Sequence, residues 1–314
     1  MSAELSVTFP CFGGRAALHA SVEPGGRAAA WRALTLAQAT LRDVHRTLTR
    51  FDAGSELSRL NADPRSTVPA GRLLRRFVAA AAEAAARSGG LVDAACLPAL
   101  LAAGYTGDLD SAARAEPGDV LSALPPAAPG APAGIAWWRD VRVDDEGRAV
   151  TRPAGLQLDS GGIAKGMAAD LAAALLARRR TFAVDCAGDV RVGGTGGVPW
   201  AIDVADPFDE HRTLERFELA RGAIATSGIT RRTWRSPAGR AAHHLIDPAT
   251  GMPARTGLVQ VTALAPTGVE AETLAKAALL AGPAGAAAWL VHGGLAVAED
   301  GDTLLVDAVQ ARAA

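Results

Sequence analysis

Cysteine is scarce in this chain of 314 residues, and neither sign of charge dominates it. The three cysteines, Cys11, Cys96 and Cys186, lie far apart without C-x-x-C spacing, which argues against a zinc site and against a disulfide framework. With 32 basic and 33 acidic residues the net charge is -1, so no overall field would attract nucleic acid or an anionic membrane. Any anion-binding site must therefore be local.

Long apolar runs are also missing. No stretch of ~18 apolar residues would span a membrane, and the first ten residues lack the basic and apolar regions of a secretion signal, so we expect a cytoplasmic protein. Hydrophobic residues make up 49% of the chain, enough for a sizeable core. We expect a single unit over 1–314, with lobes at about 1–110 and 137–314 joined by an Ala/Pro/Gly-rich irregular connection at 111–136.

Hydrophobic periodicity predicts long helices over 27–50 and 73–87, and a polar turn between 141–143 and 149–150 predicts a hairpin. After a glycine-rich turn and a helix that ends near residue 178, the chain becomes rich in strands. The expected strands are 182–185, 190–192, 200–204, 214–219, 223–226, 243–246 and 259–264. Helices over 269–280 and 284–291 and a hairpin of 296–297 with 303–306 follow. This segregation of helices and hairpin-linked strands is typical of an α+β protein.

The densest chemical signal is the segment 159–166, which reads D-S-G-G-I-A-K-G. Its glycines allow close backbone approach, the following helix start offers N–H groups, and Lys165 adds a full positive charge. These features suit a phosphate group, although the spacing is neither a P-loop nor a dinucleotide fingerprint. The residues alone leave an alternative open, in which a glycine turn caps a helix and Lys165 is merely solvated.

A second signal is the segment 243–251, H-H-L-I-D-P-A-T-G. Asp-Pro and Thr-Gly after an apolar strand are typical of a turn, which Asp247 can cap. Paired histidines also suggest a metal site, but adjacent side chains on a strand point to opposite faces. We therefore favour a structural turn here.

The combination and order of these segments resemble the ApbE family of FAD:protein FMN transferases, over most of the chain. The matching segments are 12–14 (F-G-G), 51–61 (F-D-A-G-S-E-L-S-R-L-N), 90–93 (G-L-V-D), 159–170, 187–189 (A-G-D), 225–228 (A-T-S-G) and 243–251.

This resemblance implies an α+β roll of mixed or antiparallel sheets with packed helices, which holds FAD in a cleft between two halves. It implies transfer of FMN from FAD to a threonine hydroxyl of an acceptor protein with release of AMP, whereas some relatives hydrolyse FAD to FMN and AMP. Both reactions are attacks at phosphorus and need positive charge at the phosphate oxygens. By analogy Lys165 would clamp the phosphate and Asp247 would be the base.

The family motifs also imply which residues contact FAD. These are Phe12, Phe51, Leu91, Val92, Asp93, Asp159, Lys165 and Leu245. In the family arrangement Mg²⁺ lies beside the pyrophosphate, with the backbone carbonyl of Gly162 as one ligand.

The remaining metal ligands would come from a helix that reads A-D-x-L-[AS]-T-A in the family and A-E-T-L-A-K-A here, at 271–277. Glu272 replaces the aspartate, Ala275 keeps its place, and Lys276 replaces the threonine. An ammonium has three donors and no acceptor, and it repels a divalent ion. The resemblance therefore implies Mg²⁺ at this site, whereas Lys276 departs from the ligand set that the family uses for it.

Three interpretations of Lys276 remain open. Its ammonium takes the place of the metal, pairs with Glu272 and neutralises the pyrophosphate, which would make Lys276 catalytic. Alternatively the site is disabled, and the chain is an FAD-binding protein without catalysis. In the third interpretation Glu272 and Lys276 form a solvated surface pair.

Overall fold

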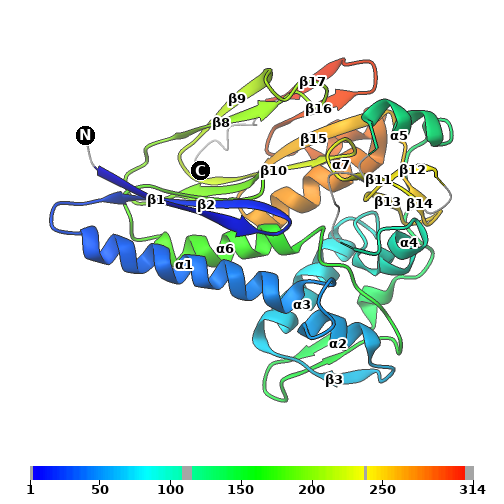
Figure 1. Cartoon of the computed structure of the whole chain (residues 1–314), viewed down its shortest axis with the longest axis horizontal. Coiled ribbons are helices and arrows are strands. Elements are labelled where there is room, and N and C mark those ends of the chain that lie inside the picture. The colour runs from blue at the N-terminus through cyan, green and yellow to red at the C-terminus, as the bar shows by residue number, and fades with distance from the viewer. Residues whose placement is uncertain (1–2, 108–114, 237–238, 308–314) are drawn as a thin grey trace.

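The computed structural model describes residues 3–107, 115–236 and 239–307 (Figure 1). Its centre is an eight-stranded sheet in the order β1-β2-β6-β7-β10-β15-β16-β17, in which all neighbours are antiparallel. The strands are β1 (Ala3–Cys11), β2 (Gly14–Val22), β6 (Phe182–Cys186), β7 (Asp189–Gly193), β10 (Gly222–Gly228), β15 (Leu258–Ala265), β16 (Gly294–Ala298) and β17 (Thr303–Val306). The expected α+β architecture is confirmed.

Smaller sheets and helices complete the molecule. The other strands are β3 (Thr67–Pro69), β4 (Arg142–Asp144), β5 (Ala149–Thr151), β8 (Trp200–Ala205), β9 (Thr213–Leu219), β11 (Thr233–Arg235), β12 (Ala241–His243), β13 (Ile246–Asp247) and β14 (Met252–Pro253). The helices are α1 (Arg27–Leu48), α2 (Glu56–Ala62), α3 (Arg72–Arg87), α4 (Leu97–Ala102), α5 (Pro117–Ala123), α6 (Ala164–Leu176) and α7 (Gly268–Trp289), with short 3-10 turns at Ala94–Cys96 and Trp137–Arg139. In Figure 1 the α2, α3 and β3 region lies below the main sheet.

Helices α1, α6 and α7 cover the central sheet, α1 over β1 and β2, α6 over β6 and β7, and α7 over β10 and β15. The helix expected over 27–50 is confirmed as α1. Its buried residues, among them Leu34, Leu41 and Leu48, recur every three or four positions and so form one continuous apolar stripe. That stripe faces β1, β2 and α6, which makes α1 a scaffold element.

Two hairpin turns meet at one end of the sheet. Phe12 and Gly13 join β1 to β2, Ala187 and Gly188 join β6 to β7, and all four residues have positive φ. Two such residues between strands fit the type I′ turn that matches the natural twist of a hairpin. A Cβ on Gly14 would lie 3.1 Å from the Cβ of Ala187, so the turns are in close contact. They bring Phe12 and the start of β7 to the same end of the sheet.

Helices α6 and α7 touch through two glycines. A Cβ on Gly166 would overlap the backbone of Gly268, and a Cβ on Gly268 would overlap the backbone of Gly166. Asp170 of α6 strengthens this junction because its carboxylate accepts the N–H of Gly268 at 2.8 Å and of Val269 at 3.1 Å. The first turns of the two helices are therefore held against each other.

Several expected elements differ in detail. The strand expected at 243–246 is split into β12 and β13, because the two halves pair with different partners. The two helices expected after residue 268 are confirmed within α7, where a non-helical kink at Gly282 (φ +71°), followed by Pro283, separates them. Helix α5 lies within the connection expected to be irregular, of which residues 111–114 are outside the described part. The hairpin β1–β2 was not expected from the sequence.

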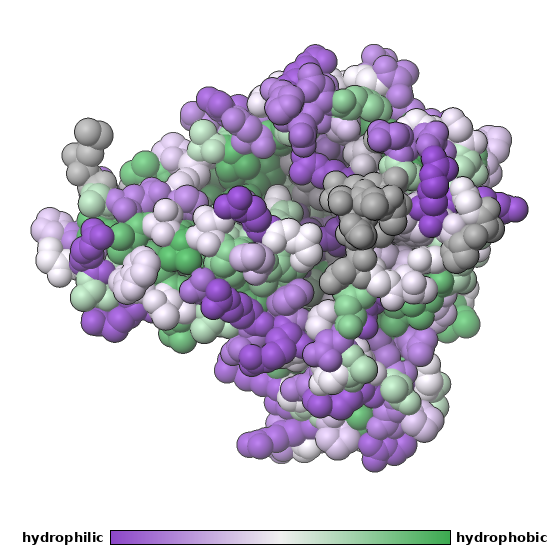
Figure 2. All heavy atoms as spheres, viewed as in Figure 1, coloured by the Kyte–Doolittle hydropathy of each residue, from purple (hydrophilic) through white to green (hydrophobic). Residues whose placement is uncertain are grey.

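The surface seen in Figure 2 is predominantly hydrophilic, with smaller hydrophobic areas between the polar ones. Within the described part of the chain, none of the helices is both long enough and apolar enough to cross a membrane.

Leu41→Ala removes a fully buried side chain from the stripe of α1. We expect the free energy of unfolding to fall by about 2–5 kcal/mol because a cavity remains. Leu36→Ala on the same helix is the matched control, since Leu36 is 54% exposed, and it should change this free energy by less than about 0.5 kcal/mol. Urea denaturation measures both changes, and equal losses would contradict the orientation of α1.

Candidate functional site

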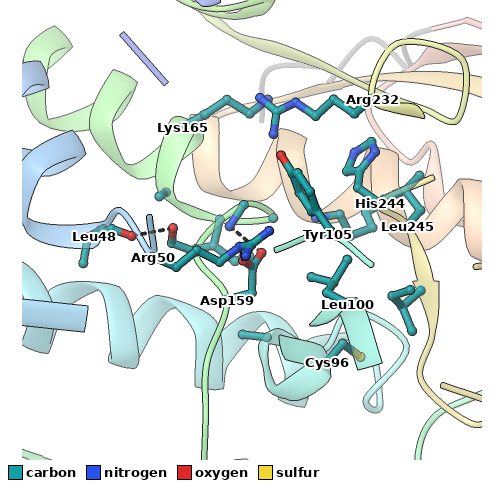
Figure 3. Close-up of a pocket in the computed structure, with 18 of the residues that line it drawn as sticks. Leu48, Arg50, Cys96, Leu100, Tyr105, Asp159, Lys165, Arg232, His244 and Leu245 are labelled. Atoms are coloured by element: carbon teal, nitrogen blue, oxygen red, sulfur yellow. Dashed lines mark hydrogen bonds and ion pairs between the residues drawn. The ribbon is translucent and has the colours of Figure 1, made fainter. Parts of the chain in front are cut away.

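A cleft lies at the end of the sheet where the two hairpin turns meet. Its lining comes from the first hairpin turn, the end of α1, the segment around α4, the turn before α6, the chain on either side of the β11–β12 hairpin, and α7. Figure 3 shows side chains from these distant parts of the sequence converging on one space. The fold therefore assembles the site from both ends of the chain.

One part of the lining is apolar and aromatic. Its members are Phe12, Leu48, Phe51, Leu91, Val92, Leu100, Tyr105, Leu245, Ile246 and Leu280. The ring of Tyr105 stacks on Trp234, with centroids 4.8 Å apart and planes inclined by 17°, and Phe51 meets Tyr105 edge-on at 5.7 Å. This wall can hold a planar ring system by stacking and burial.

Arg50 lies between the two rings of this wall. Its guanidinium carbon is 4.2 Å from the centre of Phe51 and 4.3 Å from that of Tyr105, and its Nε forms an ion pair with Asp159 Oδ1 at 3.2 Å. The side chain is 7% exposed, and its Nη2 is buried without a hydrogen-bond partner among the described residues. Arg50 therefore has a donor group available for a ligand.

The charged part of the lining is mainly cationic. Arg50, Lys165, Arg231, Arg232 and Lys276 line the cleft, against two carboxylates, Asp93 and Asp159. In Figure 3 the side chains of Lys165 and Arg232 extend toward each other, and the hydroxyl of Tyr105 points to the same region. An anionic group is therefore favoured at this end of the cleft.

Lys165 is held by two carboxylates from behind. Its Nζ lies 2.5 Å from Asp189 Oδ2 at the start of β7 and 3.9 Å from Glu272 Oε1 on α7. Burial opposes its charge, but the carboxylates of Asp189 and Glu272 raise the pKa of Lys165 above its ordinary value. Lys165 therefore carries a positive charge at neutral pH.

Glu272 is almost completely buried and accepts the N–H of Gly166 at 2.9 Å. Burial raises its pKa, and Lys165 opposes that rise. The sequence led us to expect the first N–H groups of this helix to face a phosphate. In the structure the N–H of Gly166 donates to a carboxylate of the protein itself, so this one N–H is not available to a phosphate.

Lys276 projects from α7 onto the turn before α6. A Cβ on Gly162 would overlap its Nζ and would lie 3.2 Å from its Cε, so the ammonium rests directly on the backbone of Gly162. Burial lowers the pKa of Lys276, and Glu272 opposes that change. Among the described residues, no carboxylate oxygen lies within 4.0 Å of this ammonium, which is the largest distance for an ion pair. The expected Lys276–Glu272 pair is wrong, because Glu272 contacts Lys165 instead.

The third interpretation of these residues, a solvated surface pair, is also wrong. Glu272 is 3% exposed, and Lys276 lines the cleft.

His244 lines the cleft beside Leu245 (Figure 3). Its Nδ1 is buried without a hydrogen-bond partner in the described part of the chain. Burial, followed by the positive charge of Arg232, lowers the pKa of His244 well below its ordinary value. The ring is therefore neutral at neutral pH. Its neighbour His243 is fully buried and contacts the carbonyl of Ala254 through Nε2 at 2.8 Å, so the two rings form no common metal site.

Asp247 lies outside the lining of this cleft. Its Oδ1 accepts the N–H groups of Ala131 at 3.0 Å and Ala249 at 3.1 Å, and its Oδ2 accepts the hydroxyl of Thr250 at 3.1 Å. The bonds to Ala249 and Thr250 close the turn between β13 and β14, as expected of a turn-capping residue, and the bond to Ala131 ties this turn to a distant segment of the chain.

Comparison with known proteins identifies the family. The model of the ApbE family matches residues 12–298. The chain belongs to the ApbE family. The FAD:protein FMN transferase of Rhodobacter capsulatus is 31% identical to it, and the match covers 98% of this chain and 58% of that protein. The FAD:protein FMN transferase of Treponema pallidum is 34% identical, and the match covers 41% of this chain and 39% of that protein.

Solved structures of the ApbE family share this fold. The ApbE protein of Thermotoga maritima matches with a TM-score of 0.75 at 25% identity, and the match covers 96% of this chain and 97% of that protein. The flavinyl transferase ApbE of Pseudomonas stutzeri matches with a TM-score of 0.74 at 24% identity, and the match covers 97% of this chain and 95% of that protein. The chain nevertheless spans only 39% and 58% of the two relatives named first.

Most residues expected from the ApbE motifs converge on the cleft. Phe12, Phe51, Leu91, Val92, Asp93, Asp159, Gly162, Lys165, Leu245 and Lys276 all line it. Glu272 lies just behind Lys165, and Ala275 is fully buried in the core around β10 and β15. Asp93 caps the 3-10 turn at residue 94, where it accepts the N–H of Ala95 and the indole N–H of Trp137, each at 2.7 Å.

The sequence patterns did not point to Arg50, Tyr105, Arg231 and Arg232, and they assigned His244 to a structural turn rather than to the cleft. Two signals were present in the sequence. Tyr105 is the only tyrosine in the chain, and lysine occurs only twice against 30 arginines. Both lysines, Lys165 and Lys276, line the cleft.

The residues of this ApbE-family cleft do not fit Mg²⁺. Within the described chain no group of three or more His, Cys, Asp or Glu side chains is arranged to hold a metal ion. The ammonium of Lys276 lies at Gly162, and Glu272 is engaged by Gly166 and Lys165. A divalent ion about 4 Å from one ammonium would be repelled by roughly 8 kcal/mol at an effective dielectric constant of 20.

A double-mutant cycle tests the contact between Gly162 and Lys276. Gly162→Ala should destabilise the protein more than Gly162→Ala in a Lys276→Ala background, because the new methyl group overlaps the ammonium. We expect a coupling of roughly 0.5–3 kcal/mol in the free energy of unfolding. Gly134→Ala is the control, because its Cβ meets no atom within 4 Å. Additive effects of the two substitutions would contradict the contact.

Proposed function

We propose that this protein transfers FMN from FAD to a threonine hydroxyl of an acceptor protein and releases AMP. Membership of the ApbE family and the names of its relatives support this activity. The observation that carries the proposal is the division of one cleft into an aromatic wall and a cationic end. FAD presents the same two surfaces, a planar ring system and a pyrophosphate.

The aromatic wall is the proposed site of the flavin ring. Phe51 and Tyr105 stand edge-on to each other, and Phe12 comes from the strained hairpin turn, where its φ is +57°. Such strain in a residue other than glycine is commonly found at ligand sites. Arg50, fixed between Phe51 and Tyr105, directs its unpaired Nη2 to a carbonyl or phosphate oxygen of the ligand.

The cationic end is the proposed site of the pyrophosphate. Lys165, Lys276 and Arg232 would neutralise its oxygens and stabilise the additional charge that develops when the phosphorus is attacked. Asp189 and Glu272 fix Lys165 in position rather than bind the ligand.

In the reaction, the threonine oxygen forms a bond to the phosphorus of the FMN half. The bond between that phosphorus and the bridging oxygen breaks, and AMP leaves with the electron pair. The threonine proton passes to the neutral ring of His244, which lines the cleft, whereas both oxygens of Asp247 are already bonded within a turn. Water in place of threonine would give FMN and AMP.

The second candidate is a flavin-binding protein without transferase activity. It is favoured by one observation, the ammonium of Lys276 on the backbone of Gly162, the residue whose carbonyl the family resemblance assigns to a metal. Release of AMP distinguishes the two candidates.

The test incubates the purified chain with FAD and a randomised peptide library that contains a fixed central threonine. We expect AMP to appear and a subset of peptides to gain the mass of FMN less water, detected by chromatography and mass spectrometry. Bound FAD that is recovered intact, with no AMP in the presence or absence of peptides, would support the flavin-binding protein instead.

Two variants locate the base. His244→Gln should lower the rate of AMP release by about 10²-fold or more and leave FAD affinity largely unchanged, as expected when general-base catalysis is lost. Asp247→Asn is the control, because it keeps an oxygen for the turn and should affect stability more than rate. The reverse order of rate effects would restore Asp247 as the base.

A further inference from the structure

The two lysines of this chain have different environments. Lys165 is paired with Asp189 and Glu272, whereas Lys276 makes no ion pair in the part of the chain that the structure describes. Nevertheless Lys276 is directed into the cleft, with its Nζ on the backbone of Gly162. The described residues therefore supply no carboxylate at ion-pair distance that would neutralise the positive charge of Lys276.

The choice of lysine at this position is specific, because 30 of the 32 basic residues in the chain are arginines. An ammonium is a compact point charge with three donors, whereas a guanidinium is a planar fork. Gly162 has no side chain, and that leaves the space in which the ammonium rests. The ammonium therefore lies on the backbone of Gly162, whose carbonyl the family resemblance assigns to a metal ion.

We propose that the ammonium of Lys276 replaces a divalent metal ion at the pyrophosphate of FAD, so that the protein binds and cleaves FAD without a metal. This inference rests on the proposed function and names the charge that this site uses. Lys276 is a catalytic residue in this account because its Nζ contacts the oxygens of the reacting phosphates.

The chemical step balances without a metal. The acceptor oxygen bonds to the phosphorus of FMN, the bond from that phosphorus to the bridging oxygen breaks, and AMP carries away the electron pair. The proton of the acceptor goes to His244. The ammonium of Lys276 donates hydrogen bonds to phosphate oxygens throughout and neither gains nor loses a proton.

A binding experiment tests this proposal without relying on activity. FAD affinity of the full chain is measured by titration calorimetry in EDTA and in excess Mg²⁺. We expect equal affinities in the two conditions. An affinity that rises about tenfold or more with Mg²⁺ would overturn the proposal, because that difference corresponds to a strong charge contact supplied by the ion.

Substitutions at position 276 give the matched controls. Lys276→Met should weaken FAD binding by about tenfold or more in both conditions, because the charge is lost and no ligand for a metal is added. Lys276→Thr should be equally weak in EDTA and recover at least in part with Mg²⁺. If Lys276→Met bound FAD in EDTA as tightly as the wild-type protein does, the proposal would be overturned. Unchanged thermal unfolding of both variants confirms that they are folded.

Lysine-specific reductive methylation provides a readout on the unaltered protein, because its side-chain targets are Lys165 and Lys276 alone. FAD in EDTA should protect Lys276, as measured by peptide mass spectrometry. Methylation of Lys276 at the same rate with saturating FAD would overturn the proposal. Failure of FAD to bind under every condition would instead refute the proposed function, whereas binding that requires Mg²⁺ would refute only the replacement of the metal.

Discussion

The close contact of α6 and α7 at Gly166 and Gly268 is the constraint on which the site depends. Neither glycine can carry a side chain without overlapping the other helix. Because the backbones touch there, Glu272 on the next turn of α7 reaches the N–H of Gly166 and the ammonium of Lys165. One turn further, Lys276 reaches Gly162. The charge arrangement of the cleft follows from this packing.

The consequence is a site in which positive charge faces the cleft and negative charge lies behind it. Asp189 and Glu272 compensate Lys165 from within the protein and keep it charged despite burial. Among the described residues Lys276 has no such close partner, and the anionic ligand that we propose would complete its environment. Opposite this charged region, the rings of Phe51 and Tyr105 enclose Arg50, which connects the apolar and the charged parts of the cleft. This division is the physical basis for proposing FAD as the ligand.

Much of this arrangement could be predicted from the sequence, because local patterns determine it. The stripe of α1, the hairpin of β4 and β5, and the glycine-rich turn before α6 were all recognisable. The interaction partners of individual side chains were not, since they depend on tertiary packing. Spacing on one helix suggested that Glu272 pairs with Lys276, but the touching glycines give Glu272 two partners on α6 instead. Tyr105 and Arg232 reach the cleft from segments without a motif, so their part in it depends on the fold.

The most direct test of the central claim is a crystal structure of the FAD complex grown with Mn²⁺, whose anomalous scattering reveals any bound metal. The account predicts pyrophosphate oxygens at hydrogen-bond distance from Nζ of Lys276 and no anomalous peak in the cleft. A manganese ion between the pyrophosphate and Gly162, with Lys276 displaced, would contradict it.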